Sequence, residues 1–365
     1  MNVGDLVRIL ETIAPARFAA AWDNVGLLVG DEATLLERVL LAIDCTAEVL
    51  DEARRGRANA IVSYHPPIFT GQKRFVAGSV AHDAARAGIA IHSPHTALDV
   101  ADGGTNDVLA DALSMTAREP LRRLEPPDAA LKLVTFVPSE HIDAVSRAVY
   151  AAGAGRIGEY SSCGFRAAGT GTFFGEPGTR PAVGRPGRLE ECAELRFETV
   201  VPVTRVADVV RALRAAHPYE EPAFDLVRLA SLPEARGMGR VGPIEPASVS
   251  ALIARIKRAL SIEHVLVAAP AGSVDRDVSR VAVCAGSGGD LVPDAIASGA
   301  ELFLTGELRH HDALRATAAG LTVLCVLHSA SERAALVELE RRLAEGLPGV
   351  SIVRSRVDRE PFAFA

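Results

Sequence analysis

Three features that would each assign the chain to a class are missing from the sequence. No apolar run approaches the roughly 20 residues that a membrane-spanning helix needs, so we expect no membrane partner. The five cysteines are scattered and no C-x-x-C pair occurs, which fits a reducing compartment better than a disulfide framework. Basic residues are not in excess, because the formal net charge is −7, whereas non-specific binding of nucleic acid depends on excess lysine and arginine. Nucleic acid is therefore not expected as the main partner.

The N-terminal residues 1–15 place acidic residues within an amphipathic helical pattern, which is not the pattern of a signal peptide. We therefore expect a cytoplasmic protein. The hydrophobic fraction of 48% and the charged fraction of 23% are typical of a globular chain. A chain of 365 residues is too long for one small hydrophobic core, so two domains are expected.

The first third of the chain alternates between strand and helix patterns, and the alternation returns after residue 240. The predicted strands are 38–46, 59–64, 89–94, 300–308 and 321–329, together with 279–290, where the strand leads into a glycine-rich turn. The predicted helices are 46–56, 80–88, 106–115, 291–299, 310–320 and 331–346. Strands separated by helical segments indicate β-α-β units and a mostly parallel sheet.

The middle of the chain follows a different order. Residues 117–130 are rich in proline and charge and are predicted to be a linker. From residue 131 onwards the patterns give strand, helix, glycine-punctuated strands at 169–184, a further strand and a helix, an order that is typical of a ferredoxin-like α+β unit. We therefore predict an α/β main domain with a mostly parallel or mixed sheet and flanking helices, interrupted by an inserted ferredoxin-like α+β domain. The main domain is expected at 1–128 and 236–365, and the insertion at 129–235.

Side chains of the kind that bind metals occur at the carboxyl ends of four of the predicted strands. In open α/β sheets, ligands bind at the carboxyl ends of the strands. Histidine and carboxylate side chains occur there in four groups, which are His65; His92, His95 and Asp99; Glu307, His310 and His311; and His328 with Glu332.

Each group also has a purely structural explanation. His65 lies on a stiff turn between a tyrosine and two prolines and can be a turn residue. Asp99 can be a turn aspartate, and the polar residues at 307–311 can cap a helix. Ser329 and Glu332 fit the S-x-x-E capping box.

The four groups together favour a metal site more strongly than any one of them does. They are expected to meet above one edge of the sheet, where burying so many ionisable groups without a counter-charge is costly. One divalent cation, or two bridged by carboxylates, removes that cost. Histidine with carboxylate and without cysteine suits zinc, iron, manganese, cobalt or nickel.

Three other segments invite a functional interpretation that the sequence does not favour. GMGRVG at 237–242 matches G-x-G-x-x-G, but it follows a proline-containing linker and leads into PIEP and not into a helix. AGSGGD at 285–290 could bind an anion, but it lacks the lysine of a P-loop and is interpreted as a tight turn. In HPYEEP, His217, Glu220 and Glu221 could bind a second ion, but a structural turn is the favoured interpretation.

Several blocks of the sequence resemble those of one known family, in the same order along the chain. They are AWDNVGLLVG (21–30), LAIDCT (41–46), IVSYHPPIF (61–69), HTALDVADGGTNDVLA (95–110), VCAGSGGD (283–290), FLTGELRHHDALRA (303–316) and LHSASER (327–333). The family is the GTP cyclohydrolase I type 2 homolog family, also called NGG-interacting-factor-three-like. The resemblance covers essentially the whole chain, and the middle segment is similar to the PII- or CutA-like insertion that longer members carry.

The resemblance implies a dinuclear metal centre with two divalent ions per chain. Zinc or iron is the first choice, and manganese, cobalt and nickel are the alternatives. The implied metal ligands are His65, His95, Asp99, His328 and Glu332, and the polar residues near the site that we expect to act in catalysis are Glu307 and His311. The resemblance also implies a toroidal homohexamer.

One residue departs from the pattern of this family. The family usually has two histidines before the proline, and Tyr64 stands in place of the first of them. A phenolate can bind iron, whereas a neutral tyrosine is a poor ligand for zinc. The site can therefore hold one metal, use Tyr64 as a metal ligand, or bind one of two metals more weakly, and we favour two metals with altered affinity.

The expected function is metal-dependent hydrolysis of a nucleotide or another phosphate-containing small molecule, as in a GTP cyclohydrolase or a phosphoesterase. This substrate class is implied by the resemblance, since the sequence contains no purine-specific signature. The alternative is a non-catalytic protein that holds metal or acts as a regulatory scaffold, with a small effector bound by the inserted domain. Loss of turnover in a folded His328→Ala variant separates the two functions.

Overall fold

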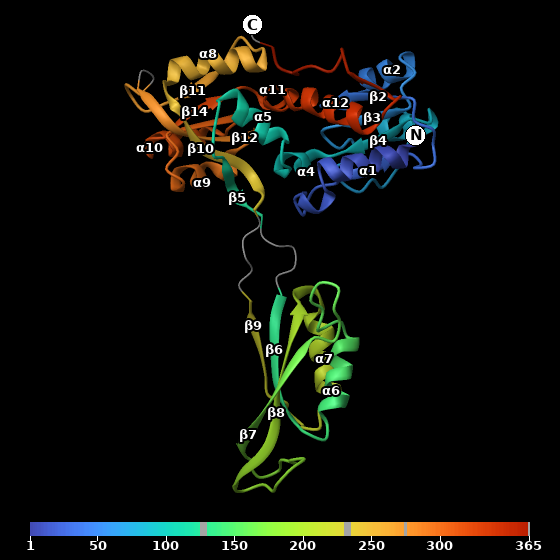
Figure 1. Ribbon diagram of the computed structural model, residues 1–365, viewed down its shortest axis with the longest axis vertical. Helices are drawn as coiled ribbons and strands as arrows, with labels where there is room; N and C mark the ends of the chain where they lie inside the picture. Colours follow the sequence, from blue (N-terminus) through green and yellow to red (C-terminus); the bar gives the residue numbers. More distant parts are fainter. Residues whose placement is uncertain (125–129, 230–234, 274–275, 364–365) are drawn as a thin grey trace. The chain divides into compact units, whose positions relative to one another are not determined.

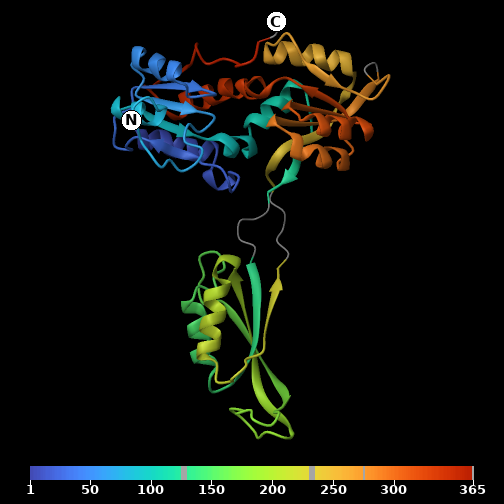
Figure 2. The ribbon, with the colours of Figure 1, turned by 180° about the vertical axis from the view of Figure 1, so that it is seen from behind.

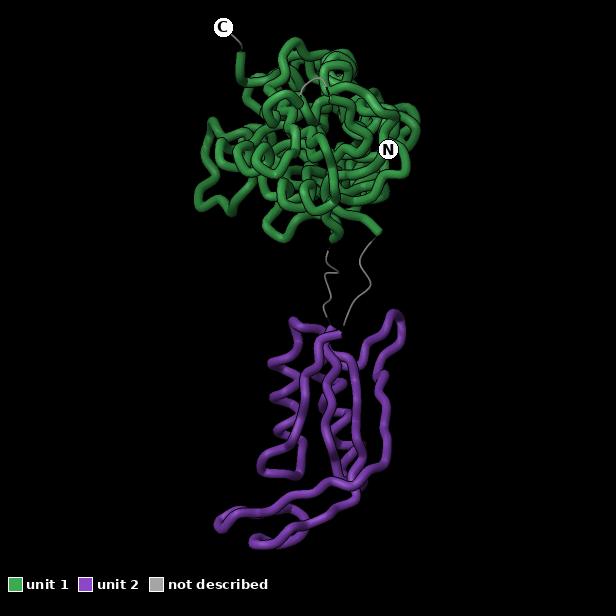
Figure 3. The backbone as a smooth tube through the Cα atoms, turned by 90° about the vertical axis from the view of Figure 1, so that its left-hand side faces the viewer, with its two compact units in different colours: residues 1–124, 234–365 green, residues 125–233 purple. Residues whose placement is uncertain are grey.

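The computed structural model describes residues 1–124, 130–229, 235–273 and 276–363. The chain divides into two compact units, one formed by residues 1–124 and 234–365 and the other by residues 125–233 (Figure 3). In sequence, the second unit interrupts the first. None of the helices in these ranges is both long enough and apolar enough to cross a membrane.

Five strands form the first sheet of the first unit, in the order β1-β4-β3-β2-β15. The last four are mutually parallel, and β1 is antiparallel to β4. The strands are β1 (Gly26–Val29), β2 (Arg38–Ala42), β3 (Ala60–Ser63), β4 (Ala90–Ser93) and β15 (Ser351–Arg354). Every residue of β3 and β4 is buried, which is typical of parallel strands covered on both faces.

Three helices cover the two faces of this sheet, namely α1 (Val3–Ile13), α2 (Ala47–Arg55) and α3 (Val80–Arg86). Helix α1 packs on the face that contains Leu41, and α2 and α3 pack on the face that contains Leu40. The helix boundaries have local causes, since Asn2 forms a capping box at the start of α1 and Thr46 caps the start of α2.

Six strands form a second sheet in the first unit, in the order β11-β14-β13-β12-β10-β5. The central strands β12, β13 and β14 are parallel, and the outer pairings are antiparallel. The strands are β5 (Glu119–Arg123), β10 (Gly237–Ser248), β11 (Leu266–Ala268), β12 (Asp277–Ser287), β13 (Leu302–Glu307) and β14 (Thr322–Cys325). The expectation that all site residues meet above one sheet edge is therefore wrong, because the two halves of the chain build separate sheets.

The remaining helices of the first unit lie on and between the two sheets. They are α4 (His95–Val100), α5 (Thr105–Ala112), α8 (Val249–Leu260), α9 (Val292–Ala297), α10 (His310–Ala318), α11 (His328–Arg333) and α12 (Ala335–Gly346). Helices α4 and α12 contribute to the core of the first sheet, and α5 and α8 to that of the second. Figures 1 and 2 show the α4–α5 and α11–α12 segments passing from one sheet to the other.

Two sequence predictions about local structure need correction, and the rejection of a nucleotide loop at GMGRVG agrees with the structure, because this segment lies in the extended strand β10. Residues 117–130 are not a simple linker, because β5 lies within them and pairs with β10. The single helix predicted at 331–346 is two helices, since α11 ends at Arg333 and α12 begins at Ala335.

The described part of the second unit contains four antiparallel strands and two α-helices. Its sheet has the order β7-β8-β6-β9. The elements follow one another as β6 (Ala130–Pro138), α6 (Ile142–Ala151), β7 (Gly164–Phe174), β8 (Leu189–Pro202), α7 (Val206–Ala216) and β9 (Phe224–Arg228). Both helices pack on one face of the sheet (Figure 1). The strand pattern predicted to run to residue 184 ends at Phe174, because the chain then leaves the sheet in a loop.

Candidate metal centre

Residues from both sheets of the first unit meet at the candidate site. His65 follows β3, and its backbone N–H continues the parallel ladder by donating to the carbonyl of Ile43, 2.9 Å away. His328 and Glu332 lie on α11, which follows β14 of the second sheet. They are four residues apart, so their side chains project from the same face of the helix.

These three side chains bring their polar atoms together. His65 Nε2 lies 3.2 Å from Glu332 Oε2, and His328 Nε2 lies 3.2 Å from Glu332 Oε1. One potential ligand atom from each residue lies within 4.8 Å of the others. Within the described ranges, this is the one group of three such side chains that meets that limit. We call it the metal triad.

A carboxylate holds the other ring nitrogen of each histidine near the site. Nδ1 of His65 lies 2.8 Å from Asp44, Nδ1 of His328 lies 3.0 Å from Glu307, and Nδ1 of His95 lies 2.7 Å from Asp23. A histidine that donates from Nδ1 presents the Nε2 lone pair to a metal, and carboxylate partners of this kind are typical of metal-binding histidines. Three such pairs at one site fix both the ring orientation and the tautomer.

The Glu332 carboxylate is buried and lacks the partners that a buried anion needs. The residue is 3% exposed, and its Oε2 atom has no hydrogen-bond partner among the described residues although His65 Nε2 is 3.2 Å away. Two Nε2 lone pairs facing this carboxylate would repel it. The arrangement therefore requires either an extra proton on each ring or a cation between the rings and the carboxylate.

Without a cation, both imidazoles must carry an extra proton. The pKa shifts of the three side chains agree in direction with protonated rings beside an ionised carboxylate. Burial lowers the pKa of His65, but Asp44 and Glu332 outweigh burial and raise it to about 10. The hydrogen bond to Glu332 raises the pKa of His328 to about 9, against the effect of burial. Burial raises the pKa of Glu332, but the two imidazoles outweigh it and lower that pKa. A divalent cation replaces these two protons with the same charge.

His95 and Asp99 lie beside the triad on α4. The ring centroids of His95 and His65 are 5.3 Å apart, and His95 has a φ of 28°, an unusual backbone conformation at the start of the helix. Burial raises the pKa of Asp99 to about 7, partly offset by its hydrogen bond from Tyr64. These two side chains form a second set of N and O atoms next to the triad.

Tyr64 is fully buried and donates its hydroxyl hydrogen to Asp99. The same hydroxyl lies 3.1 Å from Thr105 Oγ1. Burial and the nearby carboxylates of Asp99 and Glu332 raise the pKa of Tyr64 well above its usual range, so the phenol keeps its proton. In this structure, Tyr64 is a hydrogen-bond donor to a site carboxylate.

The two residues expected to act in catalysis occupy different positions. Glu307 ends β13, is exposed, and is hydrogen-bonded to His328. His311 is exposed on α10, and its ring lies against that of His310, with the ring centroids 5.4 Å apart. His311 is outside the metal triad.

The capping-box explanation for Ser329 and Glu332 is wrong. Helix α11 begins at His328, so both residues lie inside the helix. The Ser329 hydroxyl donates to Glu360, 2.8 Å away, and Glu332 faces the two histidines. The S-x-x-E pattern arises here from a carboxylate that belongs to the site.

Two site carboxylates were not predicted from the sequence. Asp44 lies two residues beyond the end of β2, which is parallel to β3, so its position at the same sheet edge was a usable signal. Asp23 contacts His95 across 72 residues, and no local pattern indicates that contact. The exposed side chain of Trp22 contacts Phe69, with ring centroids 5.7 Å apart, and His95, at 6.0 Å.

Comparison with known proteins agrees with the architecture and with the sequence blocks. A family model for Duf34/NIF3 (NGG1p interacting factor 3) matches residues 1–361. The chain is 38% identical to the GTP cyclohydrolase 1 type 2 homolog of Mycobacterium leprae, over 91% of this chain and 87% of that protein. It is 35% identical to the protein of the same name from Halalkalibacterium halodurans, over 100% of this chain and 99% of that protein.

Solved structures give the same result over the full length. The Bacillus cereus protein related to NIF3 aligns with a TM-score of 0.65 and 32% identity, covering 100% of this chain and 99% of the other. The Staphylococcus aureus protein SA1388 aligns with a TM-score of 0.68 and 25% identity, with the same coverage. The chain therefore belongs to the Duf34/NIF3 (NGG1p interacting factor 3) family.

Proposed function

We propose that this protein is a divalent-metal-dependent hydrolase that acts on a nucleotide or another phosphate-containing small molecule. The observation that carries the proposal is the buried Glu332 carboxylate, which faces Nε2 of His65 and of His328 at 3.2 Å while its Oε2 atom lacks a hydrogen bond. The relatives named GTP cyclohydrolase 1 type 2 homolog add support for a nucleotide as substrate.

The residues of the triad fit a divalent cation by their chemistry. Two imidazole nitrogens and a carboxylate oxygen suit zinc or iron, and also manganese, cobalt and nickel. A cation bound there would act as a Lewis acid and make water a nucleophile at neutral pH. Asp44 and Glu307 keep the two imidazoles oriented and make their Nε2 atoms more basic, and therefore better metal ligands.

Three groups of exposed side chains in the first unit are assigned roles in the reaction. Glu307 is half-exposed and hydrogen-bonded to His328, so it is the carboxylate that we assign to accept a proton during hydrolysis. His311 is exposed on α10, and we assign it a contact with the leaving group of the substrate. The exposed rings of Trp22 and Phe69 beside His95 provide a stacking surface for a nucleobase.

A turnover assay tests the proposal. The metal-supplemented protein is incubated with a panel of nucleotides and phosphodiesters, and His328→Ala is expected to lose turnover while it remains folded. His310→Ala is the matched control, because His310 is exposed on α10 and outside the triad. Metal that exchanges readily in a protein without turnover on any substrate would favour the non-catalytic alternative, a metal-holding protein or regulatory scaffold.

We further propose two metal ions of unequal affinity, a tight one at the triad and a weaker one at His95 and Asp99. The hydrogen bond from Tyr64 occupies an Asp99 oxygen that a second metal would need. Tyr64→His removes that donor and adds an imidazole, so we expect the second metal to bind about tenfold more tightly or better.

Stepwise titration with Co²⁺ measures this effect on the second metal. Tyr64→Phe is the control, because it removes the hydroxyl without adding a ligand and separates the two contributions. An unchanged second dissociation constant in Tyr64→His would refute the assignment of the weaker metal to His95 and Asp99.

We also propose that residues 129–235 form an inserted ferredoxin-like domain of the PII or CutA kind. The β-α-β-β-α-β order and the sheet order β7-β8-β6-β9 support this assignment. The homohexamer remains a proposal that rests on the family resemblance, and light scattering of the purified protein tests it. The cytoplasmic location remains a proposal that rests on the scattered cysteines and on the N-terminal sequence pattern.

A further inference from the structure

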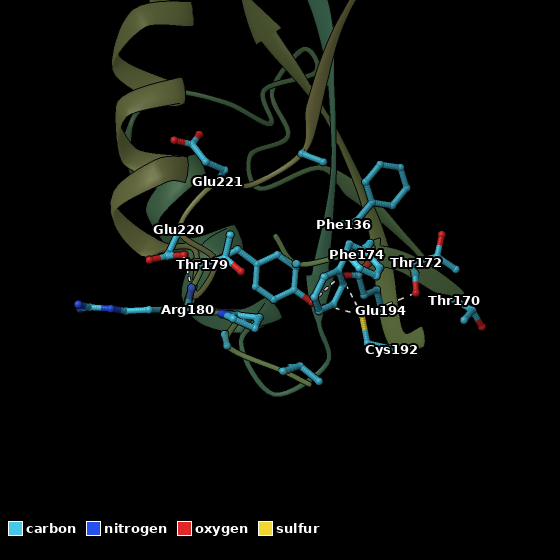
Figure 4. A pocket seen from close by; sticks show the side chains of 18 residues that line it. Phe136, Thr170, Thr172, Phe174, Thr179, Arg180, Cys192, Glu194, Glu220 and Glu221 are labelled. Atoms are coloured by element: carbon cyan, nitrogen blue, oxygen red, sulfur yellow. Dashed lines mark hydrogen bonds between the residues drawn. The ribbon is translucent and has the colours of Figure 1, made fainter. Parts of the chain in front are cut away.

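The second unit contains a cavity of about 470 Å³ that is separate from the metal triad. Its walls come from β6, β7 and β8, from the loop after β7, and from the loop between α7 and β9. Phe136, Phe174, Cys192 and Glu194 are among the residues that line this cavity (Figure 4). Its volume is in the range of sites for small organic ligands.

A carboxylate forms the polar end of the cavity. Glu194 is 8% exposed, and its Oε1 atom accepts a hydrogen bond from the Tyr219 hydroxyl at 2.6 Å. The Cys192 sulfur lies 3.5 Å from the same oxygen. Gly171 lies opposite, where a β-carbon would be 2.1 Å from Oε2, so the absence of a side chain keeps this second oxygen free of steric contact.

The loop that contains Tyr219 is held in place by His217. The His217 Nε2 atom donates to the carbonyl of Phe136 at 3.0 Å, and Nδ1 accepts from the Tyr219 backbone N–H at 3.1 Å. Both ring nitrogens are therefore engaged with the backbone. This agrees with the interpretation of HPYEEP as a structural turn and leaves no histidine nitrogen there for a second ion.

The charge on Glu194 is not balanced by the protein. Its two neighbours, the Tyr219 hydroxyl and the Cys192 thiol, are neutral donors whose pKa values are raised by burial. No lysine or arginine in the described ranges forms an ion pair with it. Arg180 points away from Glu194 (Figure 4), and its backbone N–H donates to Glu220 at the rim. Burying a carboxylate without a cationic partner is unfavourable.

We propose that this cavity binds a small organic cation, an amine, amidine or guanidine on a flat apolar body, whose N–H groups bind Glu194. The N–H groups would donate to Oε2, and the body would contact Phe136, Phe174 and Tyr219. A metal ion fits less well, because the thiol and the phenol keep their protons and donate to the carboxylate. This site is independent of the hydrolase activity proposed for the first unit.

Calorimetric titration of the full chain with benzamidine and with benzamide tests the proposal. The two probes have nearly the same shape, but benzamidine is a cation with an additional N–H donor. We expect benzamidine to bind about tenfold more tightly or better, because its positive charge balances the buried carboxylate and its additional N–H can donate a second hydrogen bond to it. Glu194→Gln keeps an oxygen for Tyr219 and is expected to abolish the preference for benzamidine.

Two controls locate the binding. Glu191→Gln lies on the same strand outside the cavity lining and should retain the preference. Glu332→Gln should also retain it, which separates this cavity from the carboxylates of the metal centre. The proposal would be overturned by equal affinity for the two probes or by the absence of benzamidine binding, both measured on the unmodified protein. It would also be overturned by an unchanged preference in Glu194→Gln.

Discussion

Glu332→Gln is expected to weaken the binding of Co²⁺ or Zn²⁺ by at least about 100-fold, which is the upper end of the effect of losing an outer-shell partner. The reason is that Glu332 provides the negative charge at the centre of the triad, within 3.2 Å of both His65 Nε2 and His328 Nε2. The amide keeps the shape of the side chain and removes the charge. Competition titration with a chromophoric chelator measures the dissociation constant.

The matched control for this variant is Glu345→Gln. Glu345 is an exposed glutamate on α12, where it forms a surface ion pair with Arg341. This variant should bind metal as the unmodified protein does, and thermal unfolding should show that both variants are folded. If Glu332→Gln bound metal within threefold of the unmodified protein, the triad would not be the metal site.

Arg240→Met is expected to destabilise the first unit by about 3 kcal/mol, because it breaks a buried ion pair and leaves Asp107 with only its longer contact to Arg118, at 3.4 Å. Arg240 is 5% exposed on β10, and its Nε lies 2.7 Å from Asp107 of α5. The same guanidinium donates to the carbonyls of Val100 and Ala101 at the end of α4. One side chain thus connects the second sheet to the helix that carries His95 and Asp99.

Urea unfolding measures this loss, with fluorescence of Trp22 as the signal. Trp22 is the single tryptophan and lies in the first unit, so its fluorescence reports on that unit. Arg341→Met is the control, because Arg341 forms solvent-exposed ion pairs on α12, whose loss should change the free energy of unfolding far less than the loss of the buried pair. A loss in Arg240→Met no larger than that in the control would contradict the structural role of the buried pair.

Much of the candidate site could be predicted from where the strands end. His65 follows a fully buried strand, and His328 and Glu332 follow another with helical spacing. Strand periodicity and strand order along the chain were enough to place these residues at sheet edges. The same information could not show that two sheets are present, because the pairing of β5 with β10 joins residues more than 100 positions apart.

The rest of the site depends on long-range contacts that local patterns do not contain. Asp23 meets His95 across 72 residues, and Tyr64 meets Asp99 across 35. In the S-x-x-E segment, the local pattern was misleading. It fits a helix cap, but in the tertiary structure the Glu332 carboxylate lies beside His65. Tyr64 could be singled out in the sequence, but its role as a donor to Asp99 needed the structure.

Elemental analysis of the protein purified without added metal tests the central claim most directly, when it is carried out beside His65→Ala and His328→Ala. Because the two histidines come from different sheets and face one carboxylate, we predict at least one divalent metal ion per chain and its loss in both variants. A second, substoichiometric ion would agree with a weaker site at His95 and Asp99. Absence of metal from the unmodified protein, or the same metal content in both variants, would contradict the claim.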